Sequence, residues 1–168
     1  MMTGHFDAAL DIAQKWSVDW EIDVKSINLR ENLIAISMKA LGRNAEAMVS
    51  AREALNRFAQ KKQQGLDDHR VVAAELEAYA ILGDQQKVSE LVEKVLTTKP
   101  ADAVEDFNIR YRIAQNYAYA GMYAESIATL DALLSGISSI SVPYVELDPA
   151  FNSIRNEPGF IALMEKHR

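Results

Sequence analysis

Apolar residues recur along this chain at spacings of three and four, in paired stretches that a glycine separates. Within residues 112–134, Ile113, Ala114 and Tyr117 recur at i, i+1 and i+4, which places them on one face of a helix. Gly121 follows them, and a second apolar stripe comes after it. Because glycine takes the left-handed conformation after a helix at no steric cost, this stretch predicts a tight hairpin of two helices.

Weaker copies of this hairpin lie upstream. The turn glycines are Gly4, Gly42, Gly83 and Gly121, so neighbouring turns are 38, 41 and 38 positions apart. Near-constant spacing of helix hairpins is the signature of a solenoid. The pattern predicts helices over Ile22–Leu41, Ala45–Ala59, Asp67–Leu82, Gln85–Thr97, Ala103–Ala120 and Tyr123–Ser135, with an extended link near Ser17–Trp20 and a polar connection over Lys61–Gly65.

These segments predict a single all-α domain over residues 1–168. It contains a half repeat at 4–16, full repeats at 22–60, 67–100 and 103–135, and a C-terminal cap at 136–168. Runs of β-branched residues with period-two alternation are scarce, so we expect no sheet. A hydrophobic share of 49% with 25% charged residues is that of an ordinary globular protein.

Charge and composition narrow the classes of partner. The net charge of −6 argues against binding to a nucleic-acid backbone, which needs a basic face. The absence of cysteine removes disulfides, thiolate metal sites and cysteine nucleophiles, and fits a reducing cytoplasm. No apolar run approaches the roughly 20 residues of a membrane span, and the N-terminus lacks a signal-peptide profile. We therefore expect a soluble cytoplasmic protein that binds neither nucleic acid nor membrane.

Residues at fixed offsets from the glycines carry a resemblance to a known family. The last hairpin has Ile113, Ala114, Tyr117, Gly121, Tyr123, Ser126, Leu130 and Leu133; the middle one Leu76, Tyr79, Gly83, Val88, Val92, Val95 and Pro100; the first Ile34, Ala35, Met38, Gly42, Ala47, Ala51 and Ala54. From Gly4 to Leu134 the chain resembles the tetratricopeptide repeat (TPR), a helix hairpin of nominally 34 residues. The resemblance implies a right-handed α-solenoid with a concave binding face. Longer units and Glu75 at a usually apolar position leave other helical-hairpin arrays open.

The tail departs from the repeat and has a pattern of its own, L-D-P-x-F-x-x-x-R-x-x-P-x-F from Leu147 to Phe160. Asp148 before Pro149 predicts a helix start, and Asn156 is predicted to cap the last helix. We expect the apolar tail residues to cover the last hairpin, while residues 165–168 face water: the covering set is Phe151, Ile154, Phe160, Leu163 and Met164. This pattern resembles the end of TPR regions that close bacterial regulatory proteins such as adenylate cyclases, serine/threonine kinases and winged-helix regulators.

Residues with catalytic potential are few and scattered. His5, His69 and His167 are far apart in polar settings, and we expect all three to be exposed without a role. No HExxH, Gly-rich phosphate loop or G-x-S-x-G pattern is present. Four carboxylates allow either a metal cluster or an ordinary solvated helix face with Lys87 and Lys94 as partners: Glu75, Glu77, Glu90 and Glu93. We favour the helix face, and predict no enzyme, no cofactor and no metal site.

The sequence thus predicts a non-catalytic scaffold that binds a protein or peptide through its concave face. The alternatives are a regulatory C-terminal module of a larger signalling enzyme or transcription regulator and, more remotely, a small all-helical enzyme. The resemblance assigns the groove to Asn32, Ile36, Arg70, Glu77, Asn108, Tyr111, Arg112, Gln115 and Tyr119. Ile36 and Ala74 replace asparagines of the chaperone-tail clamp, so we do not expect that ligand.

Tyr111 and Tyr119, placed off the core face, form with Arg112 and Gln115 the predicted centre of binding. The alternative is that Arg112 pairs with a nearby acid and the tyrosines cover the cap.

The first predicted helix has one apolar face, and we expect it to be the second helix of a hairpin whose first helix is missing, so that the chain begins in mid-repeat. That face consists of Phe6, Ala9, Leu10, Ala13 and Trp16. Exposed apolar surface of this kind usually marks an interface. We expect either burial by an upstream repeat or a homodimer through Phe6, Leu10 and Trp16.

Overall fold

A computed structural model describes residues 6–15, 20–22, 27–65, 69–97, 100, 102–136 and 140–168. Their regular structure is helical apart from one short strand pair, which confirms the predicted helical class. The chain divides into two compact units, an N-terminal unit (Gly4–Thr98) and a C-terminal unit (Lys99–Arg168). In the described part of the chain, no helix is long and apolar enough to cross a membrane.

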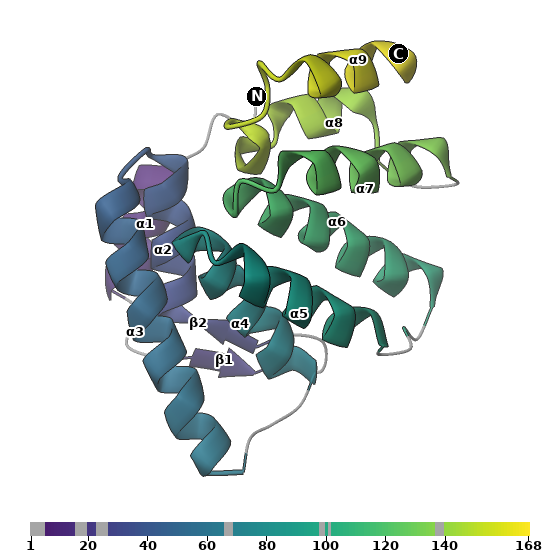
Figure 1. Ribbon diagram of the computed structural model, residues 1–168. Coiled ribbons are helices and arrows are strands. Elements are labelled where there is room, and N and C mark those ends of the chain that lie inside the picture. The colour runs from purple at the N-terminus through teal and green to yellow at the C-terminus, as the bar shows by residue number, and fades with distance from the viewer. Residues whose placement is uncertain are drawn as a thin grey trace. The chain divides into compact units, whose positions relative to one another are not determined.

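The N-terminal unit has five helices and two strands in its described residues (Figure 1). They are α1 (Phe6–Lys15), β1 (Trp20–Ile22), β2 (Ile27–Leu29), α2 (Arg30–Ala40), α3 (Asn44–Gln63), α4 (His69–Leu82) and α5 (Gln85–Thr97). In the C-terminal unit the elements are α6 (Ala103–Tyr119), α7 (Tyr123–Ser135), α8 (Val142–Leu147), the 3-10 turn η1 (Pro149–Phe151) and α9 (Pro158–Lys166).

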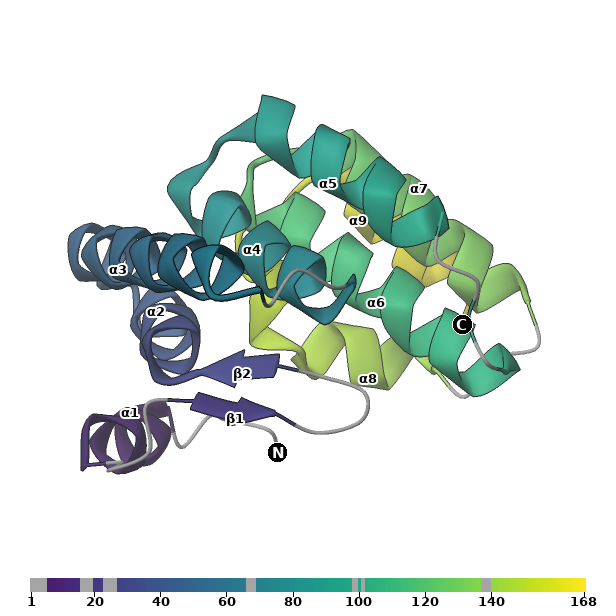
Figure 2. The same cartoon turned by 90° about the horizontal axis from the view of Figure 1, so that it is seen from below.

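The strand pair corrects two predictions at the start of this unit. Instead of a helix from Ile22, the chain forms antiparallel β1 and β2 with Trp20 opposite Leu29, and α2 begins only at Arg30 (Figure 2). Ile22 and Ile27 are β-branched residues, which favour strands when a partner strand lies opposite them. The expectation of no sheet was therefore wrong for this segment, and β2 contacts both α2 and α4.

Helix α3 also differs from its predicted length. It continues through the predicted polar connection and ends at Gln63. Lysine and glutamine are good helix formers, so a polar run extends a helix as readily as it ends one. Gly65, with φ of +92°, follows the helix end.

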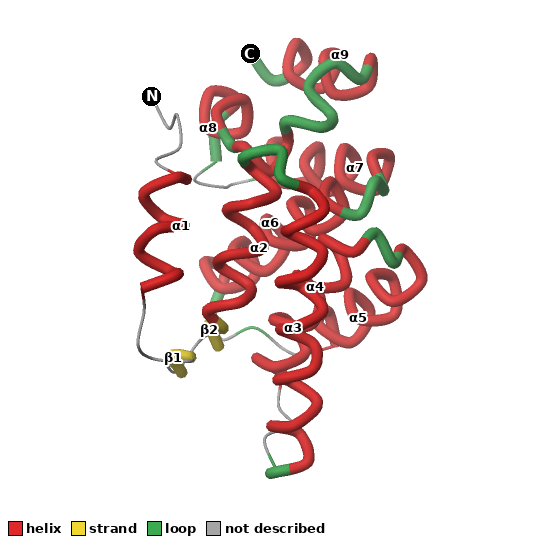
Figure 3. The backbone as a smooth tube through the Cα atoms, turned by 90° about the vertical axis from the view of Figure 1, so that its left-hand side faces the viewer, coloured by secondary structure: helices red, strands yellow, loops and turns green. Residues whose placement is uncertain are grey.

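Three pairs of consecutive helices form hairpins: α2–α3, α4–α5 and α6–α7 (Figure 3). The turns between the two helices of each pair have the same conformation. Gly42, Gly83 and Gly121 have φ of +75°, +75° and +76°. In each turn the glycine N–H donates to the carbonyl three residues earlier, and the next N–H donates to the carbonyl five residues earlier, over 2.8–3.2 Å. These two hydrogen bonds satisfy carbonyl groups at the end of the first helix. The predicted turn role of these three glycines is confirmed, whereas Gly4 lies outside the described residues.

The same positions relative to the turn glycine are buried in all three hairpins. Residues at four offsets are buried in every hairpin: Ala35, Leu76 and Ala114 seven before the glycine; Ala47, Val88 and Ser126 five after; Ala51, Val92 and Leu130 nine after; Ala54, Val95 and Leu133 twelve after. The small residues Ala47 and Ser126 at the second offset allow close helix packing. Ser126 shows how tight this contact is, because its Oγ donates to the carbonyl of Ala114 on α6 over 2.8 Å.

Helix α1 packs against α2 within the N-terminal unit. Leu10 and Ala13 are buried as their predicted face requires, but Ala9 is exposed and Phe6 is half-buried. The large residue on the outside of α1 is Ile12, which is 66% exposed. Trp16 lies outside the described residues.

The tail of the C-terminal unit covers α6 and α7 as predicted. Its five apolar residues, Phe151, Ile154, Phe160, Leu163 and Met164, are all buried in one cluster with Tyr111, Leu130 and Leu133. Asp148 starts the η1 turn, where its Oδ1 accepts from the amide of Ala150 over 2.9 Å. Asn156 is not the cap of α9; that position is Glu157, which makes no side-chain cap bond.

Candidate functional site

The predicted groove positions of the N-terminal unit lie on α2 and α4. Asn32 is only 2% exposed, and its Nδ2 donates to the carbonyl of Ala74 over 2.9 Å and to Glu77 Oε2 over 3.3 Å. Ile36 is half-buried against the core. The side chain of Arg70 lies outside the described residues. Asn32 therefore joins α2 to α4, and Glu77 and Ile36 keep part of their surface in solvent.

The sequence analysis did not predict the buried carboxylate next to Asn32. Glu31 is buried in the first turn of α2, and its Oε1 lies 3.1 Å from an Nη2 of Arg57 and 3.4 Å from that of Arg30. Among the described residues, Glu31 Oε2 and Asn32 Oδ1 are buried and accept no hydrogen bond. A Glu-Asn pair inside an otherwise apolar helical stripe is the only sequence signal for this polar centre.

In the C-terminal unit, two predicted groove residues form hydrogen bonds within the unit itself. Tyr111 is 7% exposed, and its Oη donates to Asp148 Oδ2 over 2.5 Å. Gln115 Nε2 donates to the same oxygen over 2.8 Å. Burial and the bond to Asp148 raise the pKa of the Tyr111 phenol far above its usual range. The placement of Tyr111 off the core face was therefore wrong, because the tail folds back over this side of α6.

Aromatic rings surround the same contact. The Tyr111 ring packs edge-on against Phe151, with centroids 5.9 Å apart, and stacks on Phe107 at 6.1 Å. Tyr111 thus covers the cap, as one alternative in the sequence reading held. The other predicted positions on α6 keep their accessibility: Asn108 and Arg112 are exposed, and Tyr119 is half-buried.

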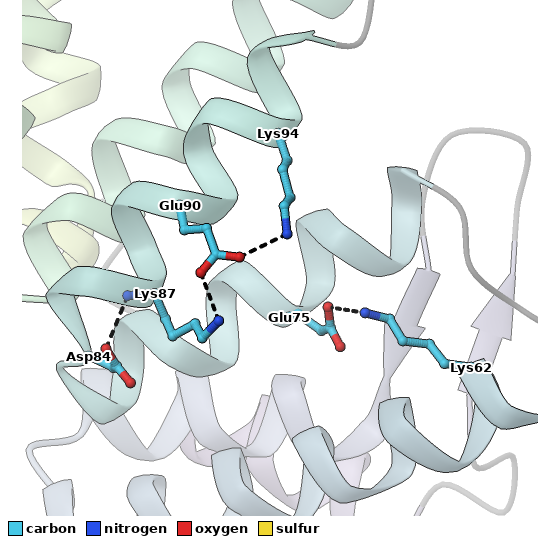
Figure 4. Close-up of polar contacts among 6 residues, drawn as sticks. All are labelled: Lys62, Glu75, Asp84, Lys87, Glu90 and Lys94. Atoms are coloured by element: carbon cyan, nitrogen blue, oxygen red, sulfur yellow. Dashed lines mark hydrogen bonds and ion pairs between the residues drawn. The ribbon is translucent and has the colours of Figure 1, made fainter.

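Two of the four carboxylates singled out in the sequence, Glu75 and Glu90, form ion pairs with lysines (Figure 4). Glu75, only 12% exposed, lies 2.7 Å from Lys62 Nζ on α3. The two oxygens of Glu90 on α5 lie 2.7 Å from Lys87 Nζ and 2.9 Å from Lys94 Nζ. Bonds to Lys87 and then Lys94 lower the pKa of Glu90 from 4.5 to about 2. Around these pairs lies a hollow of about 380 Å³ between α3, α4 and α5.

The histidines give one correction. His167 is not an exposed bystander: its side chain is 13% exposed, and its Nε2 lies 2.7 Å from Asp131 Oδ1 on α7. Lys166 Nζ also binds Asp131, over 2.8 Å, and these two bonds lower the pKa of the Asp131 carboxyl. His5 and the His69 side chain lie outside the described residues. Within the described ranges, no three metal-ligating side chains gather at one point.

Comparison with family models, with curated proteins and with solved structures finds no match to this chain.

Proposed function

We propose that the chain is a non-catalytic scaffold of the TPR type, whose hairpins stack into a right-handed α-solenoid and bind a protein or peptide partner. The observation that carries this proposal is the threefold recurrence of one hairpin, with the same turn bonds and the same buried offsets. A hairpin of this kind cannot bury its apolar face alone, and stacking is the usual solution. The tail, packed over α6 and α7, serves as the cap that such an array needs.

The partner is proposed to bind on the first helices of the hairpins, α2, α4 and α6. Among the described side chains, the predicted positions with accessible surface are Ile36 and Glu77 in the N-terminal unit, and Asn108, Arg112, Gln115 and Tyr119 in the C-terminal unit. Arginine and tyrosine are enriched among residues that dominate binding energy at interfaces. Tyr111 and Gln115 contribute indirectly by holding α6 against Asp148.

A peptide-library selection against the purified chain of residues 1–168 tests the proposal. Selected peptides should shift the backbone amide resonances of α2, α4 or α6 in an NMR titration more than those of α3, α5 and α7. The double variant Asn108→Ala/Arg112→Ala should then weaken peptides that map to α6 by about tenfold or more, the scale of an interface hot spot. Glu125→Ala on α7, also an exposed position, is the matched control.

A selection without enriched peptides, or peptides that map only to the second helices, would contradict the proposal. The regulatory-module alternative stays a prediction. Self-association through Phe6, Leu10 and Trp16 also stays a prediction, although Leu10 is already buried within its own unit.

A further inference from the structure

The hollow of the N-terminal unit lies between two parallel stripes of side chains. On α5, Lys87, Glu90, Leu91 and Lys94 follow the spacing i, i+3, i+4 and i+7, and therefore share one helix face. On α4, Val72, Glu75 and Tyr79 share a face by the same rule. Lys62, from the last turn of α3, completes the lining.

Charge in this hollow differs in sign from that of the whole chain. Three ammonium groups meet two carboxylates there, an excess of one positive charge in a protein of net charge −6. A low-dielectric wall concentrates the field of such an excess. Asp84, whose Oδ1 accepts from the amide of Lys87, lies outside the lining. The lining itself therefore favours an anion over a cation.

The two ion-paired groups have different parts in the site. Glu75 is largely buried, so Lys62 is its necessary counter-ion, and this pair forms part of the wall. Glu90 is 42% exposed and is shared by Lys87 and Lys94, each at an exposed position. Each ammonium has three N–H donors and gives one to Glu90, so both can bind a second acceptor. Figure 4 shows both lysine side chains reaching from α5 to this one carboxylate.

An apolar surface lies beside the ammonium groups. Leu91 is buried, and Val72 and Tyr79 are half-buried, all three in the lining. A volume of about 380 Å³ is at the small end of the range for ligand pockets. The hollow thus offers charge at its rim and an aromatic and aliphatic wall within.

We propose that this hollow binds a carboxylate or phosphate group carried on a small apolar or aromatic body, with the anion on Lys87 and Lys94 and the body against Tyr79 and Leu91. The site is separate from the proposed partner surface. Glu75 and Glu77 are two residues apart on α4, about 200° around the helix, so the hollow and Glu77 lie on opposite sides of it.

An NMR titration of the chain of residues 1–168 with inorganic phosphate, phenyl phosphate and benzoate tests this proposal. We expect saturable shifts of the amides around residues 87–94, stronger binding of phenyl phosphate than of phosphate, and a ranking of phenyl phosphate against benzoate that identifies the preferred anion. Lys87→Gln and Lys94→Gln should each weaken binding about tenfold, the scale of one charge-assisted hydrogen bond.

Lys15→Gln on α1 is the matched control, because Lys15 is exposed and pairs with Asp11 at 2.7 Å in the same unit. It removes the same charge and should leave binding unchanged. Circular dichroism of each variant checks the fold. Absence of saturable binding at millimolar probe concentrations, or equal weakening by Lys15→Gln, would overturn the proposal without affecting the peptide selection on α2, α4 and α6.

Discussion

The phenol of Tyr111 donates to the carboxylate of Asp148 over 2.5 Å, and this bond joins the middle of α6 to the start of the η1 turn. Both side chains are buried, so the bond is shielded from water. Asp148 also accepts from Gln115 and from the amide of Ala150. One carboxylate therefore holds both a helix face and the backbone of the tail.

Tyr111→Phe should destabilise the protein by about 1 to 3 kcal/mol, because it removes a donor from a buried carboxylate while keeping the ring. Chemical denaturation followed by circular dichroism measures the change. Tyr144→Phe is the matched control, since that tyrosine is 47% exposed. Equal effects of the two variants would mean that the Tyr111 bond adds no stability.

Asn32→Asp should destabilise the N-terminal unit more than Asn32→Leu does. The aspartate would place a buried charge opposite the carbonyl of Ala74 and beside Glu77, with the amide donor lost. We expect a loss of about 2 to 4 kcal/mol for the aspartate variant, read from urea denaturation. Asn56→Asp, at an exposed position on α3, should have little effect. A leucine variant that is as unstable as the aspartate one would show that packing, rather than charge, decides the loss.

Gly83→Ala should cost about 1 to 2 kcal/mol, because φ of +75° is a conformation that L side chains rarely adopt. No atom lies within 4 Å of the added methyl group, so the cost comes from the backbone alone. Gly136→Ala is the contrast: its φ is −91°, and the nearest atom to the new Cβ, the carbonyl oxygen of Ala132, is 3.5 Å away. There we expect a neutral or slightly stabilising change in the melting temperature. A similar loss at both positions would refute the left-handed turn as the cause.

Stability should fall between pH 4.5 and pH 2 partly through Glu90. Its pKa is depressed to about 2 in the folded chain from 4.5, so its contribution is present above pH 4.5 and is lost as the carboxyl is protonated. The pairs are solvent-exposed, so added salt should weaken the effect. An NMR titration of the Glu90 carboxyl carbon measures the pKa, and Lys94→Gln should raise it. A titration midpoint near 4.5 in the wild type would contradict the shared ion pair.

Local signals explain what the sequence could predict. The turn at Gly121 and the apolar positions around it depend on residues within one hairpin, and the structure confirms them. The late start of α2 depends on Trp20 pairing with Leu29, which no helical periodicity encodes. The burial of Tyr111 depends on Asp148, 37 positions later, and Asn32 binds the carbonyl of Ala74, 42 positions later. A polar residue on a predicted groove face gives no sign of such a distant partner.

The contacts of the C-terminal unit differ in sequence separation, and this difference predicts the order in which they form during folding. The Ser126–Ala114 contact closes a loop of 12 residues, whereas the Tyr111–Asp148 contact closes one of 37. Closing a longer loop costs more chain entropy, and chains rich in local contacts fold fastest. In a refolding experiment the α6–α7 hairpin should therefore gain amide protection before the tail docks on it, and the Tyr111 phenol should become shielded from solvent only in the later phase.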